Sequence, residues 1–251
     1  MKNPLLKINH LKKTYHDKNG EIEAVLDFTL DIYENEFIVV VGPSGCGKST
    51  ILSILANLEK KSDGDIELKR EDLIMGYMLQ KDSLFPWLTI LDNCLIGLKT
   101  NKKLTKETKN RVIELLDTYG LKEFKNKYPS SLSGGMRQRV ALIRTLAINP
   151  DILLLDEPFS ALDYQTRLAL SDDVYEIIKK EGKTAIMISH DIGESVSMAD
   201  RIVVLTQRPG TIKDIHEIDF KLENRTPLNC RKTPYFSEYF NTLWKELGVD
   251  E

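Results

Sequence analysis

One segment of the chain combines glycines with a lysine and a serine at the spacing of a phosphate-binding loop. It matches the pattern G-x-x-x-x-G-K-[ST] and reads Gly42-Pro43-Ser44-Gly45-Cys46-Gly47-Lys48-Ser49, followed by Thr50. Glycines let the backbone wrap a phosphate with successive N–H groups, and the N-terminus of the following helix adds its dipole. Lys48 is expected to reach the outer phosphates and Ser49 to bind Mg²⁺. The segment therefore predicts a nucleotide site.

Two adjacent carboxylates, Asp156 and Glu157, follow the apolar run 152–155. Folds of the α/β class bind their ligands at the carboxyl ends of buried parallel strands. There Asp156 could hold Mg²⁺, directly or through water, and Glu157 could polarise the water that attacks a γ-phosphate. An Asp-Glu pair alone is as readily explained as a helix N-cap. Beside a phosphate-binding loop, the catalytic interpretation is favoured.

A second possible anion site lies in the segment 132–138, which contains Ser133, Gly134 and Gly135. Ser133 is a suitable N-cap, and the glycine N–H groups would stand at a helix N-terminus. The chain thus has two anion-binding sequences and one phosphate-binding loop. This combination indicates that a second copy of the chain closes over the nucleotide.

The residues around these motifs predict the elements that hold them. Phe37–Val41 is a continuous β-branched run typical of a parallel strand buried on both faces, and 152–155 and Thr184–Ile188 are similar. A helix is expected over Ser49–Leu58, directly after the glycine-rich loop. Another, over Gln165–Glu181, joins two of the strands. This alternation of strands and helices predicts an α/β fold with a mostly parallel sheet core.

Two regions depart from that alternation. The first 35 residues contain β-prone pieces around the turn residues Lys18-Asn19-Gly20, which predicts an antiparallel β part. From about residue 84 to 149 the pattern is helical, at Arg111–Tyr119 and at Gly134–Ile148, where Asn149-Pro150 stops the second helix. We expect this stretch to be a helical insertion in the α/β domain.

Composition narrows the class of protein. The chain has 251 residues and a net charge of −3, which suits one large domain and weakens the case for a nucleic-acid-binding surface. Its three cysteines are far apart and support neither a zinc site nor a disulfide framework. There is no secretory signal at the N-terminus and no apolar run long enough to span a membrane. A cytosolic protein is expected, with any membrane role exerted through a partner.

The ordered set of motifs resembles the ATP-binding subunits of ABC transporters over essentially the whole chain. Residues 42–50 are similar to their Walker A motif, 132–138 to their signature motif, and Asp156-Glu157 to the end of their Walker B motif. Met136 replaces the glutamine that is usual in the signature, a common substitution in importer subunits. The resemblance implies a P-loop NTPase fold of the ABC ATPase type. One domain, 1–251, would comprise a core of residues 1–80 and 150–251 and a helical subdomain of residues 81–149.

Four further residues match positions that this family uses. Gln80 stands where the Q-loop glutamine is expected, Asp163 ends a segment similar to the D-loop, and His190 is similar to the switch histidine. Tyr15 resembles the aromatic residue that stacks on adenine, although packing at a sheet edge is an alternative. By this resemblance Gln80 contacts Mg²⁺ and the attacking water, while His190 contacts the γ-phosphate and helps to orient Glu157.

The resemblance also implies cofactors and partners. ATP and Mg²⁺ would bind between two copies of the chain, so that Ser133, Gly134 and Gly135 act across the dimer interface. Two transmembrane permease subunits and an extracytoplasmic solute-binding protein would complete an importer, with this subunit on the cytoplasmic face of the membrane. No nucleic-acid partner is expected.

Two short tags resemble the nitrate, sulfonate and taurine importers. They are Phe85-Pro86-Trp87-Leu88-Thr89, with Asp92-Asn93 after it, and Gln207-Arg208-Pro209-Gly210. The apolar residues of the first tag could line a groove for a helix of a membrane subunit or could simply pack the helical insertion. Three other functions stay open as alternatives: an exporter, a superfamily ATPase acting on ribosomes or DNA, and a small-molecule kinase.

Overall fold

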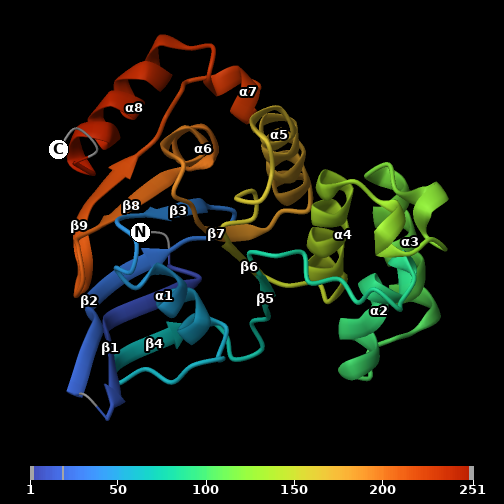
Figure 1. Cartoon of the computed structure of the whole chain (residues 1–251), viewed down its shortest axis with the longest axis horizontal. Coiled ribbons are helices and arrows are strands. Elements are labelled where there is room, and N and C mark those ends of the chain that lie inside the picture. The colour runs from blue at the N-terminus through green and yellow to red at the C-terminus, as the bar shows by residue number, and fades with distance from the viewer. Residues whose placement is uncertain (1–2, 19, 249–251) are drawn as a thin grey trace.

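A single curled sheet organises the molecule (Figure 1). The computed structural model describes residues 3–18 and 20–248; residues 1–2, 19 and 249–251 lie outside this description. Within the described residues nine strands pair in the order β4-β1-β2-β9-β8-β3-β7-β6-β5. Their bounds are β1 Leu6–Asp17, β2 Gly20–Ile32, β3 Phe37–Val41, β4 Asp63–Leu68, β5 Met75–Met78, β6 Ile152–Asp156, β7 Thr184–Ile188, β8 Arg201–Leu205 and β9 Gly210–Glu217.

The parallel part of the sheet confirms the predicted buried strands. β3 pairs in parallel with β7 and β8, and β6 pairs in parallel with β7 and β5. Alternate residues of β3 enter different cores: Phe37 and Val39 join one apolar cluster, whereas Ile38 and Val40 join the other. Because both faces are covered, each position must be apolar. The carboxyl ends of β3, β6 and β7 meet at one edge of the sheet.

The N-terminal part is antiparallel, as expected. β1 pairs with β2 on one side and with β4 on the other, both antiparallel. Asn19, in the predicted turn, lies outside the described residues. Two residue pairs in parallel register, Val25 with Gly210 and Asp27 with Thr211, join β2 to β9. The antiparallel part is thereby continuous with the parallel core.

A helical lobe lies to one side of the sheet (Figure 1), as the sequence predicts. It contains α2 Ile90–Thr100, α3 Lys106–Thr118, α4 Gly134–Ala147 and two short 3₁₀ turns, Lys122–Phe124 and Pro129–Ser131. α3 begins five residues earlier than the apolar pattern indicated, because Thr105 and Thr108 form a reciprocal capping box. α4 ends before Asn149, which adopts a left-handed φ of 52°.

The remaining helices cover the sheet. They are α1 Lys48–Leu55, α5 Tyr164–Lys180, α6 Ile192–Met198, α7 Pro227–Cys230 and α8 Pro234–Glu246. The predicted helix Ser49–Leu58 is shorter than expected, and Asn57 beyond its end has a left-handed φ of 57°. α8, which the sequence pattern did not predict, packs against α6. In the described part of the chain we find no helix with both the length and the apolar character needed to cross a bilayer.

Candidate nucleotide-binding and hydrolysis site

The glycine-rich loop between β3 and α1 has the backbone geometry of a phosphate cradle. Gly45 and Gly47 adopt left-handed φ values of 77° and 99°, which residues with a side chain rarely adopt. A Cβ on Gly47 would also lie 2.7 Å from the carbonyl oxygen of Ala24. Of residues 44–47, only Cys46 donates its backbone N–H to an acceptor in the described part of the chain. That acceptor is the carbonyl oxygen of Pro43, at 3.4 Å. The other N–H groups are available to an anion.

Lys48 is held at the mouth of this loop. Its ammonium group donates hydrogen bonds of 2.8 Å to the carbonyl oxygen of Gly42 and 2.9 Å to that of Pro43. Cys46 is fully buried, with its sulfur 3.8 Å from Nζ of Lys48. The Cys46 side chain therefore faces inward, and only its backbone can contact a nucleotide.

Two of the three predicted magnesium-binding residues lie together. The Ser49 hydroxyl donates to Oδ1 of Asp156 at 3.1 Å, and the Tyr77 hydroxyl donates to Oδ2 at 3.0 Å. Burial raises the pKa of Asp156 and, together with the nearby Asp156 charge, raises the pKa of Tyr77 to about 12. A hydroxyl and a carboxylate are hard oxygen donors that suit Mg²⁺. The residues present therefore fit this ion.

The three residues predicted for hydrolysis meet at Glu157. Its Oε2 accepts a 2.8 Å hydrogen bond from Nε2 of Gln80 and lies 3.3 Å from Nδ1 of His190. Glu157 itself has a positive φ of 45°, and its backbone N–H donates to Ile188 at the end of β7. Gln80 thus contacts Glu157 directly. A carboxylate held between an amide and an imidazole can orient and deprotonate a water molecule.

These groups surround a cavity of about 490 Å³. Its lining comprises Tyr15, Ile22, Ala24, Ser44, Gly45, Gly47, Lys48, Ser49, Thr50, Glu157, His190 and Arg208. The Tyr15 hydroxyl donates to Glu59 at 2.6 Å, and the Lys13 ammonium lies 4.6 Å from the centroid of the ring. A larger hollow of about 900 Å³ beside α3 has neither a phosphate loop nor carboxylates at strand ends.

The signature residues are absent from this lining within one chain. Ser133 caps α4 by accepting a 3.3 Å hydrogen bond from the Met136 backbone N–H. The start of α4 packs near the start of α5. A Cβ on Gly134 would lie 3.2 Å from Leu162, and one on Gly135 would lie 3.3 Å from Thr166. Asp163 caps α5, and its hydrogen bonds with Thr166 lower its pKa.

Two features of the site escaped the sequence interpretation. Tyr77, which holds Asp156, lies on the edge strand β5, and no local pattern marks it. Arg208 lines the cavity although its segment was interpreted only as a subfamily tag. The same tag places Gly210 against the phosphate loop, where a Cβ would clash with the carbonyl oxygen of Cys46. Residues 207–210 therefore contribute Arg208 to the cavity and bring the Gly210 backbone close to the phosphate loop.

Comparison with known proteins identifies the family of this chain. The family model described as "ABC transporter" matches residues 25–160. An uncharacterized ABC transporter ATP-binding protein of Bacillus subtilis, YtlC, is 46% identical over 97% of this chain and 95% of its own length. A taurine import ATP-binding protein of Rhizobium johnstonii is 38% identical over 93% of each chain. Other relatives are named for nitrate and aliphatic sulfonate import.

A solved structure extends the comparison to the fold. The dimeric ATP-binding cassette MJ0796, in a post-hydrolysis state with ADP and phosphate, superposes with a TM-score of 0.71 at 31% identity. The match covers 85% of this chain and 99% of the other. The mostly parallel α/β fold predicted from the sequence is confirmed. The chain belongs to the ABC transporter family and is an ATP-binding cassette that hydrolyses ATP.

Proposed function

We propose that this ATPase powers a multi-subunit importer for a small solute such as nitrate, a sulfonate or taurine. The observation that carries the import assignment is the similarity to import ATP-binding proteins over 93% or more of this chain. The contact of Glu157 with Gln80 and His190 beside the phosphate loop supports the hydrolysis that would power transport. Relatives named for taurine, nitrate and aliphatic sulfonate import support the solute class. The solute itself would never contact this subunit, so its identity must come from partner proteins.

In the proposed mechanism the phosphate loop binds ATP and the strand ends prepare hydrolysis. Lys48 and the loop N–H groups hold the phosphates, and Tyr15 stacks against the adenine. Ser49, Asp156 and Gln80 would hold Mg²⁺, which offsets charge on the outer phosphates when bound. Glu157 accepts the proton of the attacking water. His190 contacts the γ-phosphate and keeps the Glu157 carboxylate oriented.

A second copy of the chain completes each site. Ser133, Gly134 and Gly135 would contact the γ-phosphate bound to the partner, and Asp163 would lie at the same interface. The dimeric relative MJ0796 supports this assembly. ATP then acts as a ligand that favours the closed dimer, and hydrolysis resets it.

We assign the contact with the permease subunits to the helical part. In this division residues 1–80 and 150–251 form the core of one domain and residues 81–149 its helical subdomain. Trp87 is 70% exposed, so its side chain can contact a partner. Its ring centroid lies 5.4 Å from that of Phe85. Asn93 fixes this loop by donating to three backbone carbonyls. Arg137 and Arg144 tie it to α4 through Asp82.

Co-purification from native membranes tests the importer assignment. The tagged chain is captured from detergent-solubilised membranes of its own organism, and the accompanying proteins are identified by mass spectrometry. We expect two transmembrane permease subunits and an extracytoplasmic solute-binding protein. The melting temperature of the solute-binding protein should rise when its own solute, among nitrate, taurine and sulfonates, is added. The Trp87→Ala variant should bind ATP normally and uncouple transport. Recovery of ribosomal or DNA-repair proteins without a membrane protein would contradict the proposal.

A further inference from the structure

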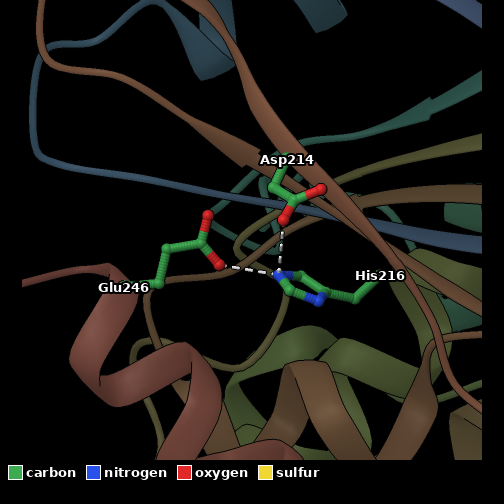
Figure 2. Close-up of side chains that lie close together, drawn as sticks. All are labelled: Asp214, His216 and Glu246. Atoms are coloured by element: carbon green, nitrogen blue, oxygen red, sulfur yellow. Dashed lines mark hydrogen bonds and ion pairs between the residues drawn. The ribbon is translucent and has the colours of Figure 1, made fainter.

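Three side chains of metal-binding types converge away from the nucleotide site, between β9 and the end of α8. They are Asp214, His216 and Glu246 (Figure 2), and one ligand atom of each lies within 4.8 Å of the others. Asp214 and His216 are two residues apart on a strand, so they face the same side of the sheet. Glu246 is the last residue of α8.

Separate interactions hold the two carboxylate residues in place. Oδ1 of Asp214 accepts a 2.7 Å hydrogen bond from the backbone N–H of Ile215, which leaves Oδ2 directed toward His216. The Lys213 ammonium donates at 2.6 Å to the backbone carbonyl of Glu246 and thereby fixes the end of α8 beside β9. The cluster is therefore largely preorganised.

The charges in the cluster are unbalanced. Both carboxylates point at the same ring nitrogen, Nε2 of His216, at 2.6 Å for Glu246 and 3.8 Å for Asp214. One proton on Nε2 can bridge to Glu246, but Asp214 is beyond hydrogen-bonding distance. Among residues 3–18 and 20–248, neither carboxylate forms an ion pair with a lysine or an arginine. By contrast, the surface pair of His16 with Glu21 contains a single carboxylate.

We propose that Asp214, His216 and Glu246 bind a divalent transition-metal ion such as Zn²⁺, which links α8 to β9. Imidazole nitrogen and carboxylate oxygen are ligands of Zn²⁺ at about 2.0–2.2 Å, which separates neighbouring ligand atoms by about 3.4 Å. Nε2 and the Glu246 oxygen would therefore move apart by about 0.8 Å, and the imidazole would bind in its neutral form.

Access to the cluster suits such a site. The Asp214 side chain is 59% exposed, whereas those of His216 and Glu246 are largely buried. Water can therefore complete the coordination from the Asp214 side. The ion would stabilise α8, whose aromatic side chains Phe236 and Phe240 pack on the main apolar cluster. α8 in turn packs against α6, which begins two residues after His190.

Metal titration of the intact, untagged and nucleotide-free chain tests the proposal. Isothermal titration with ZnCl₂ is expected to give one ion per chain, and Co²⁺ should give the visible absorption of a low-symmetry site. Zn²⁺ should also slow amide hydrogen exchange in Pro234–Glu246. Asp214→Asn leaves the hydrogen bond between His216 and Glu246 in place and should weaken Zn²⁺ binding at least about tenfold. His216→Gln should abolish it.

The matched control is His16→Gln, which removes an exposed, carboxylate-paired histidine elsewhere and should bind Zn²⁺ like the wild type. The proposal is overturned if the wild type shows no saturable binding of one Zn²⁺. It is equally overturned if His216→Gln binds as tightly as the wild type, since the ion would then lie at another site. If His216→Gln does not fold, Asp214→Asn becomes the decisive variant. Zn²⁺ affinity equal to that of the wild type in Asp214→Asn would then overturn the proposal.

Discussion

The phosphate loop and the signature segment both place glycines at a helix N-terminus, but the phosphate loop lines the cavity that holds Glu157 and His190, and the signature segment does not. Residues 42–49 follow the buried strand β3, and the neighbouring strands deliver Asp156, Glu157 and His190 to the same edge. Residues 133–135 begin α4 and pack toward Leu162 and Thr166. A helix N-terminus therefore lines the nucleotide cavity in one region, whereas in the other it packs near the start of α5 and leaves only Ser133 of residues 133–135 exposed.

We propose that the core of one chain can bind nucleotide alone, whereas turnover needs the signature motif of a second chain. The difference follows from connectivity, because parallel strands bring distant residues to one edge within a chain. The helical lobe has no such strand ends to collect partners around Ser133. The following predictions test this division.

The largest effect is expected for Glu157→Gln. Loss of the carboxylate removes the proposed general base and should reduce ATP hydrolysis by roughly 10²- to 10⁴-fold, while the neutral amide preserves binding. Phosphate release and size-exclusion chromatography with ATP should show lost turnover and an accumulated dimer. Glu71→Gln, at an exposed loop position, is the control. Near-normal hydrolysis by Glu157→Gln would refute Glu157 as the base.

Next in size is a pH effect at Glu194, beside His190. Burial raises its pKa to about 7, and Ser189 donates to its carboxylate at 2.7 Å. Between about pH 4.5 and pH 7 the folded state therefore keeps a proton on Glu194 that the unfolded state has lost. The contribution of this group to the free energy of unfolding falls as pH rises through this range. The total decrease is about 3 kcal/mol.

Urea unfolding at pH 5 and pH 7 measures this effect. The stability of the wild type relative to Glu194→Gln should decrease between the two pH values, because glutamine does not titrate. A pH-independent difference would show that burial does not govern this carboxyl group.

A smaller effect is expected for Gly210→Ala on the core side of the comparison. The added Cβ would press on the Cys46 carbonyl and distort the phosphate loop, at a cost of about 2 kcal/mol, or roughly a 30-fold loss of ATP affinity. Equilibrium titration with a fluorescent ATP analogue measures it. Gln207→Ala, exposed in the same turn, should bind normally. Unchanged affinity in Gly210→Ala would mean that the loop accommodates the methyl group.

The smallest effect is expected at the signature. Ser133→Ala should leave nucleotide binding by the dilute chain within about twofold and lower ATPase activity roughly tenfold, the loss of one hydrogen bond to a charged group. Ser131→Ala is the neighbouring control, and thermal unfolding checks the loss of the α4 cap. Weakened binding in the dilute monomer would show that Ser133 acts within its own chain.

Local patterns predicted much of the core. Phe37–Val41 and Thr184–Ile188 have the predicted bounds, because β-branched runs buried on both faces leave little choice of conformation. The ends of helices were less predictable, since caps such as Thr105 with Thr108 override the apolar pattern. The C-terminal helices α6, α7 and α8 were not predicted.

The phosphate loop, the carboxylates at a strand end and the family could all be read from the amino-acid sequence, because they depend on residue types and spacing within short segments. Three contacts became visible only in the folded chain: Tyr77 with Asp156, Gly210 with the phosphate loop, and His216 with Glu246. These contacts join residues 30 or more positions apart, and their geometry depends on sheet order and helix packing. No local pattern encodes that order, because it results from the simultaneous burial of many apolar side chains.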